Sequence, residues 1–201
     1  MRQQIEEILR FWFGPLKSGF PETNKDELWW MGTPSNDRLI TELFGHEVRQ
    51  ALRGELDHWA EEPRGRLALI LLLDQFTRTI FRGSADAFSG DHKALKLTLE
   101  GVHQGLDQAL EFSERTFFYM PLEHAEDIEM QELCITCLEA MLLEVAGVNK
   151  LKVEASIDFA YQHHRQIEQF GRFPHRNDVL ERSSTPEELA FLLQTKNRWG
   201  Q

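Results

Sequence analysis

The chain has 201 residues and a formal net charge of -11, with 41% apolar and 27% charged residues. That length can bury one sizeable core, and no Pro/Gly/Ser-rich linker divides it, so we expect a single domain over residues 1–201. The negative charge disfavours general affinity for nucleic acid or for anionic membrane surfaces. No apolar run approaches the ~18 residues of a membrane span, and residues 1–13 lack the architecture of a signal peptide, so we expect a cytoplasmic location.

The first half of the chain begins with two amphipathic patterns. Apolar residues from Ile5 to Phe13 form one helical stripe, which Gly14 and Pro15 end. Residues 16–34 read as a loop that an apolar Leu-Trp-Trp-Met run anchors to the core. A second amphipathic helix follows, which we expect to be capped by Ser35, Asn36 or Asp37 and closed at Gly54.

The stretch LALILLLDQFTRTIF, residues 67–81, begins with seven consecutive apolar residues. Such a run leaves a helix no solvent-facing side for two turns, so it predicts a helix that is buried all round. Asp74, Gln75 and Arg78 lie on its second half, where a buried charge without partners would cost several kcal/mol. The rest of the chain must therefore supply their partners.

Further helical patterns fill the second half. Pro121, Gly147 and Gly171 are expected to end helices, with a left-handed conformation at Gly171, and Thr185 with Glu188 forms a capping box. No period-two alternation requires a strand, and the connections are short. We therefore predict an all-α, single-domain stack of antiparallel helical hairpins. The expected helices cover residues 95–102, 113–120, 126–145, 153–170 and 186–193.

Cys134 and Cys137 have the C-x-x-C spacing of redox and zinc sites. They lie within an apolar helical pattern, and neither a second C-x-x-C nor a suitably spaced histidine pair accompanies them. We interpret both as small core residues.

Three segments carry more charge beside aromatic residues than packing alone requires. In the first, Asp74, Arg78 and Arg82 follow one another at intervals of four residues, so acid and bases share one helix face. This face is either a ladder of ion pairs at the rim of the core or part of a ligand site.

The second segment, ERTFFYMPLEHAEDIEMQE, places Glu123, His124 and Glu126 directly after Pro121. Carboxylates beside one histidine suit general acid–base chemistry, whereas an acidic helix start is the structural alternative. The histidine pairing of common zinc sites is missing, so we predict neither a metal nor a cofactor. Arg115 and Tyr119 precede this group on the neighbouring helix.

The third segment, HHRQIEQFGRFPHRN, ends in a Pro-stiffened loop. Loop arginines and a histidine beside phenylalanines suit the binding of a carboxylate or phosphate; alternatively, the arginines neutralise the acids of the second segment. The residues concerned are Arg172, His175, Arg176 and Asn177.

The strings LDQFTRTIFRG, YMPLEHAED and FGRFPHRN, in this order and with FWFG near the start and STPEE near the end, resemble the bacterial family called domain of unknown function 924. The resemblance covers nearly the whole chain. It implies a tetratricopeptide-like helical superhelix and no established activity. The characteristic residues that it carries over are Asp74, Gln75, Phe76, Arg78, Arg82, Arg115, Pro121, Glu123, His124, Glu126, Phe170, Gly171, Arg172, Pro174, His175, Arg176 and Asn177.

The chain also departs from that pattern. Family members usually read DQFPRN where this chain has Thr77 and Thr79, and usually have Ser and Gly at Ala125 and Glu181. If these positions contact a ligand, we expect this member to differ in its ligand or in its affinity.

Three functional hypotheses follow. In the first, a polar pocket binds a small anionic molecule or an acidic peptide end, with Asp74, Gln75, Arg78, Arg82, Arg115, Tyr119, Glu126, Arg172, Arg176 and Asn177 as binding residues. In the second, the protein is a hydrolase or lyase in which His124 or His175 is the general base and Glu123 or Glu126 orients it. In the third, it is a protein-interaction scaffold without activity.

Overall fold

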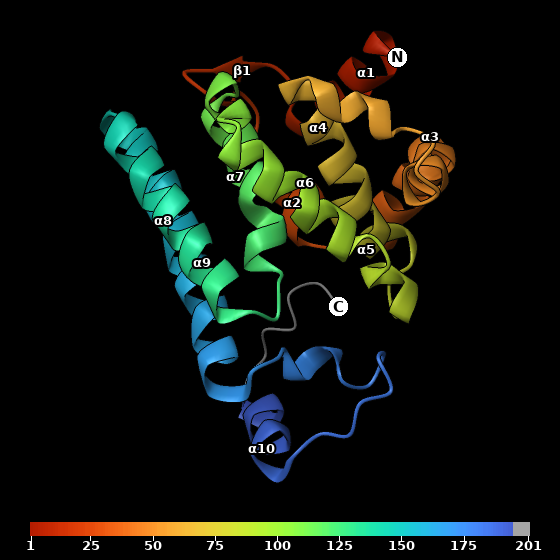
Figure 1. Cartoon of the computed structure of the whole chain (residues 1–201), viewed down its shortest axis with the longest axis vertical. Helices are drawn as coiled ribbons and strands as arrows, with labels where there is room; N and C mark the ends of the chain where they lie inside the picture. The colour runs from red at the N-terminus through yellow and green to blue at the C-terminus, as the bar shows by residue number, and fades with distance from the viewer. Residues whose placement is uncertain (195–201) are drawn as a thin grey trace.

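The computed structural model describes residues 1–194 and is an array of helices with almost no strand (Figure 1). The predicted all-α fold is therefore confirmed, while the tetratricopeptide-like superhelix stays a prediction. The α-helices are α1 (Arg2–Phe13), α2 (Asp26–Trp30), α3 (Pro34–Leu52), α4 (Pro63–Ile70), α5 (Thr77–Ile80), α6 (Asp91–His103), α7 (Phe112–Glu123), α8 (Ile128–Glu144), α9 (Lys150–Phe170) and α10 (Pro186–Gln194).

Shorter elements join these helices. Single 3-10 turns are η1 (Asp57–Glu61), η3 (Ala85–Phe88), η4 (Leu106–Ala109), η5 (Gly147–Asn149) and η6 (Pro174–Arg176). The segment expected to be a loop contains a two-residue antiparallel ladder, β1 (Leu16–Lys17) with β2 (Phe20–Pro21), in addition to α2.

The helix caps follow local chemistry, with one correction. Helix α3 begins two to four residues earlier than predicted: the hydroxyl of Thr33 accepts a hydrogen bond from the backbone N–H of Asn36 (3.2 Å), and Pro34 takes the first helical position. Because proline has no N–H to leave unsatisfied there, it favours that earlier start. Gly171 ends α9 in the left-handed conformation (φ 68°), as predicted.

The buried central helix is confirmed in place, but it is not a regular α-helix. Leu71–Phe76 (η2) forms a π-helical turn between α4 and α5, and every residue from Leu67 to Asp74 is fully buried. The hydroxyls of Thr77 and Thr79 donate to the carbonyls of Leu73 (2.7 Å) and Gln75 (3.3 Å). These bonds supply donors to carbonyls of the widened turn, a kind of turn that is common at functional sites.

Pro121 was predicted to end its helix, and this was wrong: α7 continues through it to Glu123. A proline within a helix removes one N–H and crowds the preceding turn. Side chains from α6 and α8 bind carbonyls of that turn: the Thr98 hydroxyl bonds Phe118 O (2.9 Å) and the Cys134 thiol bonds Tyr119 O (3.8 Å). The helix therefore runs three residues beyond its predicted end at residue 120, and Glu123 and His124 both line the pocket described below.

One hydrophobic cluster extends from α1 to α9. The hairpin of α8 and α9 lies beside α7, and η6 and α10 lie at the end of α9 (Figure 1). None of the helices in the described part of the chain is long and apolar enough to span a membrane.

The two cysteines lie on α8, and Cys134 is buried. Burial raises the pKa of the Cys134 thiol well above its usual range and that of Cys137 to about 11. A reactive cysteine requires the opposite shift, so this geometry favours their interpretation as core residues.

Candidate functional site

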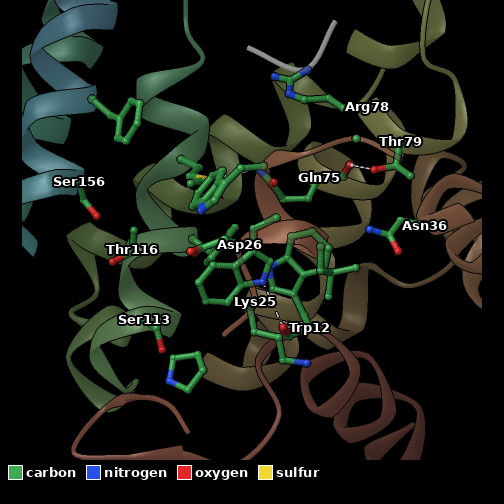
Figure 2. Close-up of a pocket in the computed structure, with 18 of the residues that line it drawn as sticks. Trp12, Lys25, Asp26, Asn36, Gln75, Arg78, Thr79, Ser113, Thr116 and Ser156 are labelled. Carbon is green, nitrogen blue, oxygen red and sulfur yellow. Dashed lines mark hydrogen bonds between the residues drawn. The ribbon is translucent and has the colours of Figure 1, made fainter. Parts of the chain in front are cut away.

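A pocket of about 760 Å³ opens between the central helix, α7, α9 and the segment that contains β2 and α2. Figure 2 shows Gln75, Arg78 and Thr79 of the central helix on one side and Thr116 and Ser156 on the other. The volume is that of a typical small-molecule site.

Asp74 and His124 form a hydrogen-bonded pair beside this pocket. The Nδ1–H of His124 donates to the carboxylate of Asp74, with distances of 2.8 Å to Oδ1 and 3.0 Å to Oδ2. Asp74 is fully buried, whereas the side chain of His124 keeps 16% of its surface exposed and lines the pocket. No residue of the described chain hydrogen-bonds Nε2 of His124, so that atom is open to a ligand.

Arginines set the charge around this pair. Arg78 donates to Asp74 (3.3 Å) and to Asp91 (3.1 Å), while Arg176 donates to the backbone carbonyl of His124 (3.1 Å). Burial opposes ionisation of Asp74, but the neighbouring His124 and Arg78 outweigh it and hold the pKa of Asp74 well below its usual range. Burial lowers the pKa of His124, so its imidazole is neutral at physiological pH.

Glu123 forms a second pair with His163 of α9. Its Oε1 lies 3.1 Å from Nδ1 of His163, and that nitrogen also donates to Phe159 O (3.0 Å). Burial, helped by the negative charge of Asp74, raises the pKa of Glu123 to about 8, and burial lowers the pKa of His163 to about 3. Glu123 is therefore a protonated carboxylic acid beside a neutral imidazole.

Gln75 links the π-turn to the pocket. Its amide nitrogen donates to Asp74 Oδ2 (2.6 Å) and contacts the sulfur of Met120 (3.2 Å). Because this fixes the orientation of the amide, the carbonyl oxygen Oε1 is left as the acceptor, and no described group donates to it.

The structure brings together part of the predicted site. Among the residues expected to bind or react, those that line the pocket are Gln75, Arg78, Arg82, Glu123 and His124, with Asp74 directly behind His124. Arg82 forms a bidentate pair with Asp37.

Other predicted binding residues lie elsewhere. Arg115 donates to Glu144 (2.8 Å) and to the hydroxyl of Tyr119, which bonds Asp107, and neither Arg115 nor Tyr119 lines the pocket. They connect α7 to α8 and η4.

The loop after α9 is held by ion pairs. Arg172 binds Glu188 through two nitrogens (2.6 and 2.8 Å), and Asn177 donates to the same carboxylate (3.1 Å). Glu126 accepts from Arg182 (2.6 Å) and from the backbone N–H of Phe173 (2.8 Å). These contacts favour the structural alternative for this segment.

His175 lies apart from the pocket, with its ring beside that of Phe173 (5.6 Å between centroids). Burial and the charge of Arg176 lower its pKa to about 3. Among the two histidines considered as bases, the geometry favours His124.

Several residues of the site were missed by reasoning from the sequence. His163 begins the third segment, and Asp91 starts α6, but neither was among the expected site residues. Arg182 lies outside the three segments, and Glu188 was expected only as part of a helix cap. The partners of the buried Asp74 and Arg78 are determined by how α6 and the end of α7 pack against the central helix.

The fold and the site define a helical protein with a buried acid–histidine pair at a pocket. The family model described as "Bacterial protein of unknown function (DUF924)" matches residues 8–196, and the chain belongs to this family. It is also similar to a solved protein of unknown function from Agrobacterium tumefaciens, with 34% identity, a TM-score of 0.80 and coverage of 96% of this chain and 99% of that one. No curated protein matches it significantly.

Proposed function

We propose that the protein is an enzyme that binds a small molecule in the pocket and transfers protons with His124 as general base and Glu123 as general acid. The observation that carries the proposal is the buried Asp74–His124 pair, whose second imidazole nitrogen is open toward the pocket.

Asp74 orients the base. An ionised carboxylate that accepts from Nδ1–H fixes the tautomer in which Nε2 bears the lone pair. Since the pKa of His124 is lowered, this lone pair is available at neutral pH rather than occupied by a proton. The same carboxylate stabilises the imidazolium that forms when His124 takes a proton from a substrate or from a water molecule.

Glu123 is the proposed general acid, which donates a proton after His124 has accepted one. Its raised pKa keeps a proton on the carboxyl at neutral pH, so it can donate to a leaving group or an oxyanion. Two groups whose pKa values are moved apart by their environments are typical of an acid–base pair. A hydrolase or a lyase is the reaction class that fits.

The anion-binding alternative has less support. Arg78 and Arg82 line the pocket, but both are paired with carboxylates, and Arg172 is paired with Glu188. Most of the positive field expected from these arginines is therefore neutralised within the protein.

The tautomer of His124 gives a test that needs no substrate. In a two-bond ¹H–¹⁵N correlation spectrum at pH 7.5, we expect Nδ1 of His124 to carry the hydrogen and Nε2 to show the shift of an unprotonated nitrogen. The variant His124→Gln assigns the signal. A hydrogen on Nε2 would contradict the role as base.

Turnover gives the second test. We would screen aryl esters, amides and epoxides with neutral, anionic and cationic side groups, against the wild type, His124→Gln and His175→Gln. The proposal predicts that His124→Gln lowers turnover by at least about a hundredfold, and that the control variant at the half-buried His175 retains it. Turnover retained in His124→Gln, or none across the whole panel, counts against catalysis at this site.

A further inference from the structure

Aromatic rings form one wall of the pocket. Trp30 stacks almost parallel on Phe117 (12° between planes, 5.8 Å between centroids), and Trp29 meets the edge of the same ring at 4.8 Å. All three residues line the pocket. Phe117 is 1% exposed and Trp30 is 52% exposed, so the buried ring supports a tryptophan that remains accessible.

This arrangement provides an accessible aromatic surface. The indole of Trp29 is held by its Nε1–H, which donates to the carbonyl of Trp12 (3.1 Å). Rings that are fixed in this way bind a flat partner with little loss of side-chain freedom, and an aromatic pair contributes about 0.5–1.5 kcal/mol beyond its buried area.

One end of the pocket is lined by Arg78, Arg82 and Glu123, and we call it the polar end. The charges around this end cancel. Arg78 is balanced by Asp74 and Asp91, the second of which also lies 3.8 Å from Arg176, and Arg82 is balanced by Asp37. Glu123 is buried beside a neutral histidine. A charged ligand group that left water for this end would meet no unpaired opposite charge among residues 1–194, and its desolvation would remain uncompensated there.

In the described part of the chain, the groups that stay open at this end are neutral. Nε2 of His124 and Oε1 of Gln75 can accept hydrogen bonds, and the carboxyl of Glu123 can donate one. A ligand group that contains both an N–H and a carbonyl, such as an amide, can donate to these acceptors and accept from the Glu123 carboxyl, and it carries no charge.

We infer that this end of the pocket selects an uncharged, amide-like ligand group that bonds Gln75 and His124, next to a flat aromatic ring that stacks on the Trp29–Trp30–Phe117 wall. This inference rests on the proposed function for the location of the ligand, and it adds the chemical class.

Three probes test the charge requirement. Phenylacetamide, phenylacetate and phenethylamine share one ring and one linker and differ mainly in the charge of the head group. We expect titration calorimetry and ligand-observed NMR at pH 7.5 to show the amide binding at least about tenfold more tightly than either ion, with probes supplied up to about 10 mM. Equal or tighter binding of an ion, or no binding of the amide, overturns the inference.

Two variants test the aromatic wall. Trp30→Leu is expected to weaken phenylacetamide binding by about tenfold while the melting temperature changes little, because the indole is half exposed. Tyr161→Leu, an exposed ring on α9 that does not line the pocket, is the matched control and should leave binding unchanged. Equal effects of the two substitutions contradict the stacking role.

The two proposals can fail separately. Preferential binding of an ion would overturn the ligand class and leave the assignment of His124 intact. A hydrogen on Nε2 of His124 would overturn the proposed base, whichever probe binds.

Discussion

Nδ1 of His124 lies 2.8 Å from Oδ1 of Asp74, so the middle of the central helix is joined to the end of α7 by one hydrogen bond between a buried carboxylate and an imidazole. Arg78 shares the same carboxylate oxygen at 3.3 Å. Asp74 therefore has two roles, since it compensates a buried guanidinium and orients the candidate base.

The first prediction concerns the charge of Asp74. Asp74→Asn removes one of the two carboxylates that neutralise Arg78, so we expect the free energy of unfolding to fall by roughly 3–5 kcal/mol in urea denaturation. Asp37→Asn is the control, because it breaks the more exposed pair with Arg82 and should cost about 1 kcal/mol or less. Equal losses would mean that Asp74 is not the electrostatic centre of the site.

The second prediction concerns pH. The folded protein keeps the proton of Glu123 up to a pKa of about 8, whereas the unfolded chain releases it near pH ~4.3. The stability due to the protonated carboxyl is fully present below the lower value and is lost as the pH rises through the higher one. Glu123→Gln carries no proton to lose, so its free energy of unfolding should rise relative to that of the wild type between pH 5 and pH 8.

A neighbouring carboxyl gives the control for this prediction. The pKa of Glu126 is lowered, because its hydrogen bonds from Arg182 and Phe173 outweigh its burial. Glu126 is ionised in both states over this interval, so Glu126→Gln should show a constant difference from the wild type. Parallel curves for wild type and Glu123→Gln would show that Glu123 is ionised in the folded protein.

The third prediction concerns the backbone contact that supports the π-turn. A β-carbon at Gly90 would lie 2.1 Å from the carbonyl oxygen of Leu73, which belongs to that turn. Because a backbone atom cannot move aside cheaply, Gly90→Ala should lower the free energy of unfolding by at least about 2 kcal/mol and shift the NMR signal of His124.

Gly45 provides the matched substitution. It lies within α3, and its added β-carbon would meet only ordinary contacts, the nearest being Arg49 Nη1 at 3.5 Å. Alanine has the higher helix propensity, so Gly45→Ala should be neutral or stabilise by up to about 1 kcal/mol. If Gly90→Ala behaves in the same way, the turn is held by other contacts.

The features that were predicted correctly from the sequence are helix ends, and their conformation depends on residues only a few positions away in the chain. The left-handed end of α9 at Gly171 and the start of α10 at Thr185, whose hydroxyl accepts from Glu188 N (3.2 Å), are local choices of conformation. The prediction at Pro121 was wrong: the helix continues through the proline, and there Thr98 and Cys134, on other helices, bind the carbonyls of Phe118 and Tyr119.

The pairing of charges could not be predicted in the same way. Arg172 was considered a ligand residue, but its carboxylate partner, Glu188, lies on α10, and Asp74 meets His124 from 50 residues away. The charged residues of this sequence could pair with one another in many ways. Only the packing of α7, α9 and α10 determines which pairs form. The sequence identified the charged segments, and the fold determined which of their charges remain open.

The last prediction concerns the ion pairs around Glu188, which is 2% exposed. Its carboxylate accepts from Arg172 (2.6 and 2.8 Å), from Asn177 (3.1 Å) and from the backbone N–H of Thr185 (2.7 Å). Glu188→Gln removes the charge that the guanidinium requires, so we expect amide hydrogen exchange over residues 172–185 to accelerate by about tenfold, the equivalent of about 1.4 kcal/mol. The exposed neighbour supplies the control: Glu187→Gln should leave exchange in this segment unchanged. If amide hydrogen exchange over residues 172–185 is equally fast in the two variants, Arg172 does not depend on Glu188 for its position. A role in ligand binding then becomes the better explanation of that arginine.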